Sequence, residues 1–163
     1  MSWPPESWYP AFEWMEATGV GTAVRQSVWA FPILEAVHLV GLALLGAAVL
    51  AGDLRLMGLG LISASPGAVL AHCRPWLAAA VIAMAATGIP MLLSEAVKCY
   101  YATAFWVKMG TLPPALALTW AGRRRLIRQD PPGHTGATRV QGAVSVLLWL
   151  TVAAAGRWIG FSA

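Results

Sequence analysis

Charged side chains are scarce in this sequence. Asp, Glu, Lys and Arg together make up 11% of the 163 residues, whereas 58% are hydrophobic. A soluble globular domain usually carries about 25% charged residues. Because a small soluble protein needs charge to cover its surface and lipid needs none, the deficit excludes an ordinary soluble domain. The sequence therefore predicts one domain embedded in a lipid bilayer.

Cysteines and signature motifs are also scarce. The two cysteines, Cys73 and Cys99, fall toward opposite membrane faces in the topology that loop charge predicts, so we expect no disulfide between them. Residues 1–10 have neither a basic start nor a continuous apolar core, and we expect no cleavable signal peptide. No zinc motif, phosphate loop or nucleophile elbow is present. The net charge of +4 does not predict a nucleic-acid partner, because the basic residues flank apolar segments.

Four apolar stretches come close to the roughly 20 residues that a helix needs to cross the hydrocarbon. They are residues 29–52, 75–94, 104–121 and 142–159. We therefore expect an all-α integral membrane four-helix bundle over residues 29–163. Residues 1–28 mix aromatic side chains with three glutamates, which favours a short amphipathic helix at the outer interface. Such a segment could clamp the bundle in register or dock a partner.

Loop charge predicts the orientation of the spans. Five arginines lie between the third and fourth spans, which places that loop in the cytoplasm; they are Arg123, Arg124, Arg125, Arg128 and Arg139. Alternation then puts the N-terminal segment, the loop with Lys98 and the C-terminus outside. We expect a multi-pass protein of the bacterial inner membrane. Its expected partners are the lipid bilayer and either a membrane or periplasmic protein or a second copy of the chain.

Ionisable residues at membrane depth are costly and are therefore functional candidates. Glu35 and His38 lie three residues apart on one face of the first span, near its outer end. The same stripe continues to Asp53, which with Arg55 predicts an ion pair or a lipid contact at the inner boundary. His72 and Arg74 are expected at that inner boundary as well, where they could meet a ligand or a lipid headgroup.

A polar cluster is expected in the outer half of the bundle. Glu95 ends the second span on the outer side, and Lys108 lies about one turn into the third. Because antiparallel spans align their outer ends, Lys108 is the expected counter-ion of Glu35 or Glu95. Other residues at a similar depth are Thr87, Gly88, Met91, Ser94, Met109 and Gly110.

His38 is the candidate ligand of a cofactor. A haem b would find an imidazole and nearby glycines, and copper accepts imidazole and thioether ligands, with Met91 or Met109 as second ligand. His38 and His72 should lie roughly 20 Å apart in depth, so one iron cannot bridge them. A second haem ligand would then be a methionine or a histidine of another subunit, unless the iron is five-coordinate. A di-iron carboxylate site is disfavoured because its Glu-x-x-His motif occurs only once.

Other functions remain open for the same residues. Glu35, His38 and Lys108 could form a structural polar clamp between helices. In that case the chain would be a non-catalytic accessory or anchoring subunit of a larger complex. Passage of protons or a small solute is a further alternative, and the sequence does not decide whether the protein is an enzyme.

Two segments carry a resemblance to known families. Residues 32–60, PILEAVHLVGLALLGAAVLAGDLRLMGLG, and residues 87–110, TGIPMLLSEAVKCYYATAFWVKMG, resemble an uncharacterised bacterial family of four-helix membrane proteins. They are more faintly similar to copper-resistance D-type and b-type cytochrome membrane proteins. The resemblance covers about residues 8–125 and implies four helices. It highlights Glu35, His38, Asp53, Arg55, Gly88, Glu95, Phe105 and Lys108, and it assigns no reaction. The most concrete functional hypothesis, a redox-linked or metal-handling subunit, rests on the expected outer-half cluster around His38.

Overall fold

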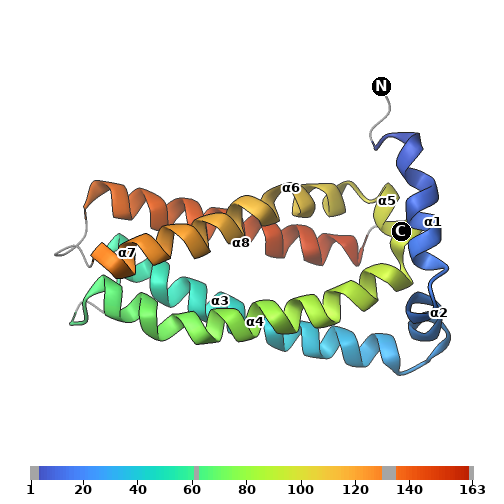
Figure 1. Ribbon diagram of the computed structural model, residues 1–163, viewed down its shortest axis with the longest axis horizontal. Helices are drawn as coiled ribbons and strands as arrows, with labels where there is room; N and C mark the ends of the chain where they lie inside the picture. Colours follow the sequence, from blue (N-terminus) through green and yellow to red (C-terminus); the bar gives the residue numbers. More distant parts are fainter. Residues whose placement is uncertain (1–3, 61–62, 130–134, 162–163) are drawn as a thin grey trace.

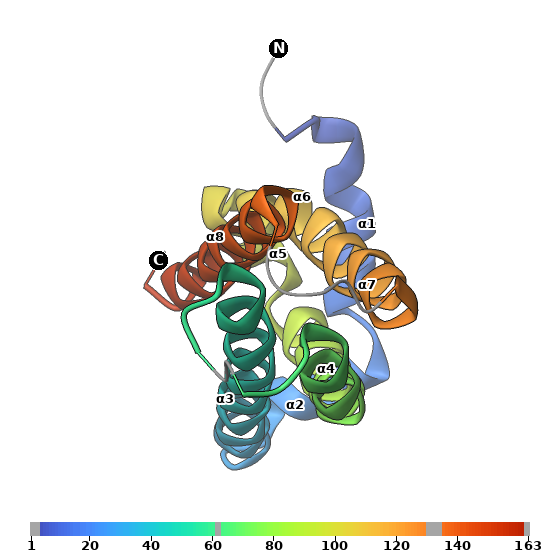
Figure 2. The ribbon, with the colours of Figure 1, turned by 90° about the vertical axis from the view of Figure 1, so that its left-hand side faces the viewer.

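The computed structural model of the chain describes residues 4–60, 63–129 and 135–161, and these contain helices and no strand. Four helical rods lie side by side in this part of the chain (Figures 1 and 2). Three rods are single helices: α3 (Ala30–Met57), α4 (Pro66–Ser94) and α8 (Gly136–Ile159). The fourth runs through α6 (Thr103–Ala117), the π-helical turn η2 (Leu118–Gly122) and α7 (Arg123–Gln129). α3 packs on α4 and α8, α6 packs on α8, and α7 packs on α4, so the rods close a ring.

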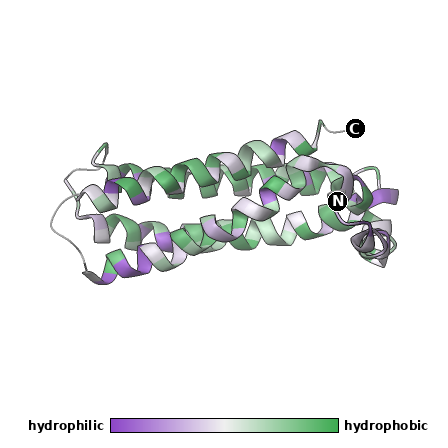
Figure 3. Cartoon of the chain, turned by 90° about the horizontal axis from the view of Figure 1, so that it is seen from above, coloured by the Kyte–Doolittle hydropathy of each residue, from purple (hydrophilic) through white to green (hydrophobic). Residues whose placement is uncertain are grey.

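Three helices, α3, α4 and α8, are long and apolar enough to cross a membrane. Hydrophobic residues line the middle of the bundle, and hydrophilic residues gather toward its two ends (Figure 3). Large apolar side chains such as Val40, Ile82 and Leu147 are exposed on the surface of these helices. A helix can expose such side chains along its length when lipid surrounds it. The chain is a membrane protein.

The third predicted span, residues 104–121, is interrupted. α6 has 15 residues and contains Pro113 and Pro114, and the helix then continues as η2. A proline lacks a backbone donor and its ring crowds the preceding turn, whereas a π-helical turn accommodates one extra residue. α6 alone is shorter than the roughly 20 residues of a crossing. A fourth crossing must therefore include η2 as well as α6.

The arginine-rich segment is more helical than the sequence predicts. Residues 123–139 were expected to form a loop, but α7 covers residues 123–129 and α8 begins at Gly136. The start of α8 is stabilised by a capping box in which the side chains of Thr135 and Thr138 bond each other's backbone N–H groups. Expecting a loop was wrong because arginine is a good helix former, and charge alone does not end a helix.

The N-terminal segment forms a 3-10 turn and two short α-helices rather than one helix. η1 (Glu6–Trp8) and α1 (Tyr9–Glu16) are followed by α2 (Gly19–Gln26), and the Thr18 side chain caps α2 by accepting from the Gly21 N–H. α1 packs on the short helix α5 (Ala96–Tyr101), and α2 packs on α4. Phe12 is buried in an aromatic cluster with Tyr9, Tyr100, Phe105 and Trp106. This packing fits the clamping role expected for the segment.

The two ends of the bundle are chemically different. We call the end formed by residues 4–29 and 95–102 the cap end, and the opposite end, which carries α7, the arginine end (Figure 1). The sequence predicts that the cap end is outside. Between the two ends, the largest apolar core cluster joins α3, α4, α6 and α8 around Leu45, Val49, Leu77 and Trp149.

Candidate functional site in the cap half of the bundle

His38 lies at the contact between α3 and α4, where it bonds Thr87. Nδ1 of His38 is 2.7 Å from Oγ1 of Thr87. The Thr87 hydroxyl donates its single hydrogen to the carbonyl oxygen of Ala83, also at 2.7 Å. Its oxygen must therefore accept from His38, so Nδ1 carries the proton of the neutral imidazole. The lone pair is left on Nε2, for which the described residues supply no hydrogen-bond partner.

Glycines allow the two helices to approach at this level. A Cβ atom on Gly88 would lie 3.1 Å from Cε1 of His38, closer than most carbon contacts in proteins. One turn toward the arginine end, a Cβ atom on Gly41 would lie 3.4 Å from the sulfur of Met84. The imidazole ring therefore packs directly on the backbone of α4.

Lys108 of α6 completes the cluster. Its positive charge lies within electrostatic range of the neutral imidazole of His38, and its amine reaches α8, where a Cβ atom on Gly156 would lie 3.4 Å from Nζ. None of the ion pairs in the described part of the chain involves Lys108. The cap half of the bundle thus holds an imidazole at the contact of α3 with α4 and an amine at the contact of α6 with α8, and neither group pairs with a carboxylate of the described residues.

The predicted carboxylates are not part of this cluster. Glu35 is exposed, and no ion pair of the described residues includes it. Glu95 lies at the cap end, where its Oε2 is 3.7 Å from Nζ of Lys98. Residues three apart on a helix point about 60° away from each other. His38 can therefore enter the contact with α4 while Glu35 stays on the surface, and the expected grouping of Glu35, Glu95 and Lys108 is not assembled.

The methionines that could bind a metal lie in two different regions of the bundle. Met109 packs on the aromatic cluster of the cap end. Met84 and Met91 lie three and four residues from Thr87 on α4, about one turn on either side of it. Met84 was missed in the sequence, although its spacing from Thr87 places it on the same face of α4.

The two described histidines are far apart. His38 is level with Thr87, and His72 lies fifteen residues from Thr87 along α4, about 22 Å at 1.5 Å per residue. His72 is also exposed. Within the described ranges, no three residues among His, Cys, Asp and Glu are grouped to hold a metal ion. One iron cannot bind both histidines.

A second buried polar group lies at the arginine end. Asp53 does not pair with Arg55 as expected: its Oδ1 is 2.7 Å from Nη2 of Arg123, and both side chains are buried. Arg123 also donates to the carbonyl oxygens of Ala48 and Val49. Arg55 instead donates from Nε to the carbonyl oxygen of Ala64 at 2.7 Å. The local pair was the wrong prediction because neighbouring helix positions point in different directions.

Comparison with known proteins identifies the chain at the level of family. Residues 11–162 match a family of unknown function, DUF6644. The chain belongs to this family. No curated protein and no solved structure matches it. The expected resemblance to a family without assigned function is thus confirmed, whereas the fainter likeness to copper-resistance and cytochrome proteins stays a prediction.

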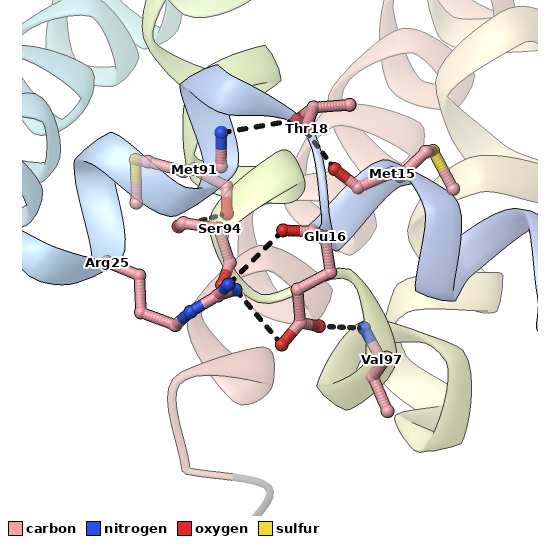
Figure 4. A network of polar contacts seen from close by, with 8 residues as sticks. Met15, Glu16, Thr18, Arg25, Met91, Ser94 and Val97 are labelled. Carbon is pink, nitrogen blue, oxygen red and sulfur yellow. Dashed lines mark hydrogen bonds and ion pairs between the residues drawn. The ribbon is translucent and has the colours of Figure 1, made fainter.

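In this DUF6644 protein, Glu16 connects helices of the cap end through hydrogen bonds and an ion pair (Figure 4). Its Oε1 lies 3.1 Å from Nη1 of Arg25, and its Oε2 accepts from the Val97 N–H at 2.7 Å. The carboxylate thereby caps the start of α5, whose first N–H groups lack helical partners. Arg25 in turn donates to the carbonyl oxygen of Ser94 at 3.2 Å. The network joins α1, α2, α4 and α5.

An open cleft of about 560 Å³ adjoins this network at the cap end. Its charged lining consists of Glu16, Arg25, Glu95 and Lys98, which pair with one another as two ion pairs. A charged ligand would have to displace one of these pairs. The neutral imidazole of His38, together with the amine of Lys108, is therefore the stronger functional candidate of this DUF6644 chain.

Proposed function

We propose that the protein is a redox-linked or metal-handling subunit of the bacterial inner membrane that holds haem b or copper at His38. The observation that carries the proposal is the hydrogen bond from Nδ1 of His38 to Thr87, because it leaves the lone pair on Nε2. Histidines that bind metals almost always donate their other ring N–H to a fixed acceptor, which sets the tautomer and the ring orientation. A purely structural histidine does not need a free nitrogen.

The residues around His38 can supply part of a metal site. Imidazole and thioether both suit copper, and Met84 and Met91 lie about one turn from Thr87 on the same helix. For haem, His38 would be one axial ligand, and a histidine of a second subunit or copy could be the other. Either group would supply one-electron transfer. The positive charge of Lys108 would favour the reduced state, since reduction removes positive charge from the centre.

The test is the cofactor content of the purified protein. Protein prepared under mild conditions, from cells supplied with copper and a haem precursor, should contain one of the two by metal analysis and visible absorption. His38→Ala should lose it. His72→Ala, a matched control on an exposed histidine, should keep it. Thr87→Val should weaken metal retention about 10- to 100-fold, because the valine cannot fix the imidazole. A wild-type protein with neither haem nor copper would overturn the proposal.

The cap end favours a second candidate, a non-catalytic accessory subunit. Trp14 and Trp29 are 71% and 73% exposed, while other aromatic residues of the cap end pack together. Exposed tryptophans are frequent in protein interfaces and also at membrane interfaces. If the chain docks a partner here, Trp14→Ser should abolish co-purification of that partner, and Val40→Ser on the exposed middle of α3 should not. In this case the His38→Ala protein would still bind the partner.

A further inference from the structure

A small cavity lies between α4, η2 and α7 at the arginine end, away from His38. Its volume is about 20 Å³, enough for one water-sized atom. Apolar and basic side chains share its lining, which includes Leu70, Arg74, Trp120, Arg123, Arg124 and Ile127. A site of this size admits an oxygen atom and not a whole ligand. The rest of a ligand would have to lie outside the cavity, along the helix surfaces.

Arg123 lines this cavity and carries an unused hydrogen-bond donor. Its side chain is only 5% exposed, and its Nη groups bond Asp53 and the carbonyl oxygens of α3. Its Nε is buried without a partner. A buried N–H group without an acceptor destabilises the fold. The natural occupant of the cavity is therefore an oxygen that accepts a hydrogen bond.

The rim of the cavity favours an anionic oxygen. Arg74 and Arg124 are exposed, and neither makes an ion pair within the described part of the chain. Guanidinium groups match the geometry of phosphate oxygens. Leu70, Leu77 and Ile127 form an apolar wall, and Thr119 and Trp120 complete the lining. Basic pockets between membrane helices at the level of the headgroups bind anionic lipids.

We propose that this cavity and its rim bind the phosphate group of an anionic phospholipid. One phosphate oxygen lies at Nε of Arg123, and the others lie at Arg74 and Arg124. The glycerol and the start of the acyl chains then lie on the apolar wall. The site is independent of the function proposed for His38. It distinguishes Arg74 and Arg124 from Arg125 and Arg128, which are exposed on α7 but do not line the cavity.

The experiment measures retention of phosphatidylglycerol by the full chain, using native mass spectrometry after reconstitution in phosphatidylcholine vesicles with increasing phosphatidylglycerol. The wild type should retain one phosphatidylglycerol molecule in preference to phosphatidylcholine. The double variant Arg74→Gln/Arg124→Gln should bind it more weakly, by about fivefold for each arginine. The control Arg125→Gln/Arg128→Gln removes the same charge from exposed positions of α7 and should bind like the wild type. Both pairs should fold, since none of the four side chains is buried.

Two results would overturn the proposal. Equal losses in the two double variants would mean that net charge, and not a built site, attracts the lipid. A second arm adds inorganic phosphate to pure phosphatidylcholine vesicles. If free phosphate binds and the protein does not retain phosphatidylglycerol in preference to phosphatidylcholine, the cavity holds a soluble anion and not a lipid.

Discussion

Arg123 and Asp53 are 70 positions apart in the sequence, yet Nη2 of the arginine lies 2.7 Å from Oδ1 of the aspartate. Their side chains are 5% and 1% exposed. Gly52 makes room for the pair, since a Cβ atom there would lie 2.8 Å from Nη1 of Arg123. The π-helical turn η2 directly precedes Arg123. Its extra residue turns the following helix by about 100° relative to an unbroken α-helix, which accounts for Arg123 facing inward while Arg124 and Arg125 stay exposed.

Breaking this pair should destabilise the protein strongly. Arg123→Met or Asp53→Asn alone should cost about 3–5 kcal/mol, because a single buried charge or its unpaired partner is left in the bundle. The double variant should cost less than the sum of the two, since both charges leave together. Unfolding in detergent, followed by tryptophan fluorescence, measures the three losses. Arg125→Met serves as the exposed control, and strictly additive losses for Asp53 and Arg123 would argue against their contact.

Substitutions at Gly88 and Gly46 test how closely His38 packs on the backbone of α4. Gly88→Ala should place a methyl group 3.1 Å from Cε1 of His38, whereas no atom lies within 4 Å of a Cβ at Gly46. The imidazole cannot move aside without losing its bond to Thr87. We expect Gly88→Ala to be about 1–3 kcal/mol less stable than Gly46→Ala, as in other overpacked contacts. Thermal unfolding of the two variants in the same detergent makes the comparison, and equal stabilities would contradict the observed packing.

Cys99 should be unreactive in the folded protein. Burial, reinforced by the negative charge of Glu95, raises the pKa of this thiol from 9.0 to about 11. At pH 8 the folded protein should therefore hold about 100-fold less Cys99 thiolate than the unfolded chain, and thiolate is the form that alkylates. In a Cys73→Ala background, the rate of iodoacetamide labelling should rise with pH up to about 11.

The raised pKa of Cys99 also determines how the stability of the protein changes with pH. The folded state holds the proton more tightly than the unfolded state, so unfolding becomes easier as the pH rises from about 9 to about 11. Below about pH 9 the thiol is protonated in both states and should not affect the pH dependence. Replacing Cys99 by Ala should remove this alkaline contribution. A labelling midpoint near the ordinary pKa of about 9 in the folded protein would contradict the burial of the thiol.

The two ends of the bundle should face opposite sides of the membrane. We expect the arginine end in the cytoplasm, because basic residues next to membrane helices are retained there. In a Cys73→Ser/Cys99→Ser background, Arg128→Cys should be labelled by an impermeant maleimide only after the cells are opened. Trp14→Cys, at the cap end, should be labelled in intact spheroplasts. The reverse pattern would place His38 in the cytoplasmic half.

The apolar helices could be predicted from the sequence with little ambiguity. Long runs of hydrophobic residues need lipid or a core around them whatever the rest of the chain does. The residues predicted for the first, second and fourth spans lie within α3, α4 and α8, apart from Trp29, which caps α3. His38 was likewise a candidate from its cost at membrane depth alone. These features depend on residue type and local spacing, which the sequence contains.

The pairing of polar residues was decided only by the tertiary structure. A span has the same composition whichever way it is rotated, so the sequence could not reveal that Glu35 faces outward while His38 bonds Thr87. A single extra residue in η2 rotates α7 about the helix axis, and it brings Arg123 rather than Arg55 to Asp53. The hydrophobic effect selects which segments are buried and has no direction. Hydrogen bonds and ion pairs depend on rotation and register, and these are set by the packing of all four rods together.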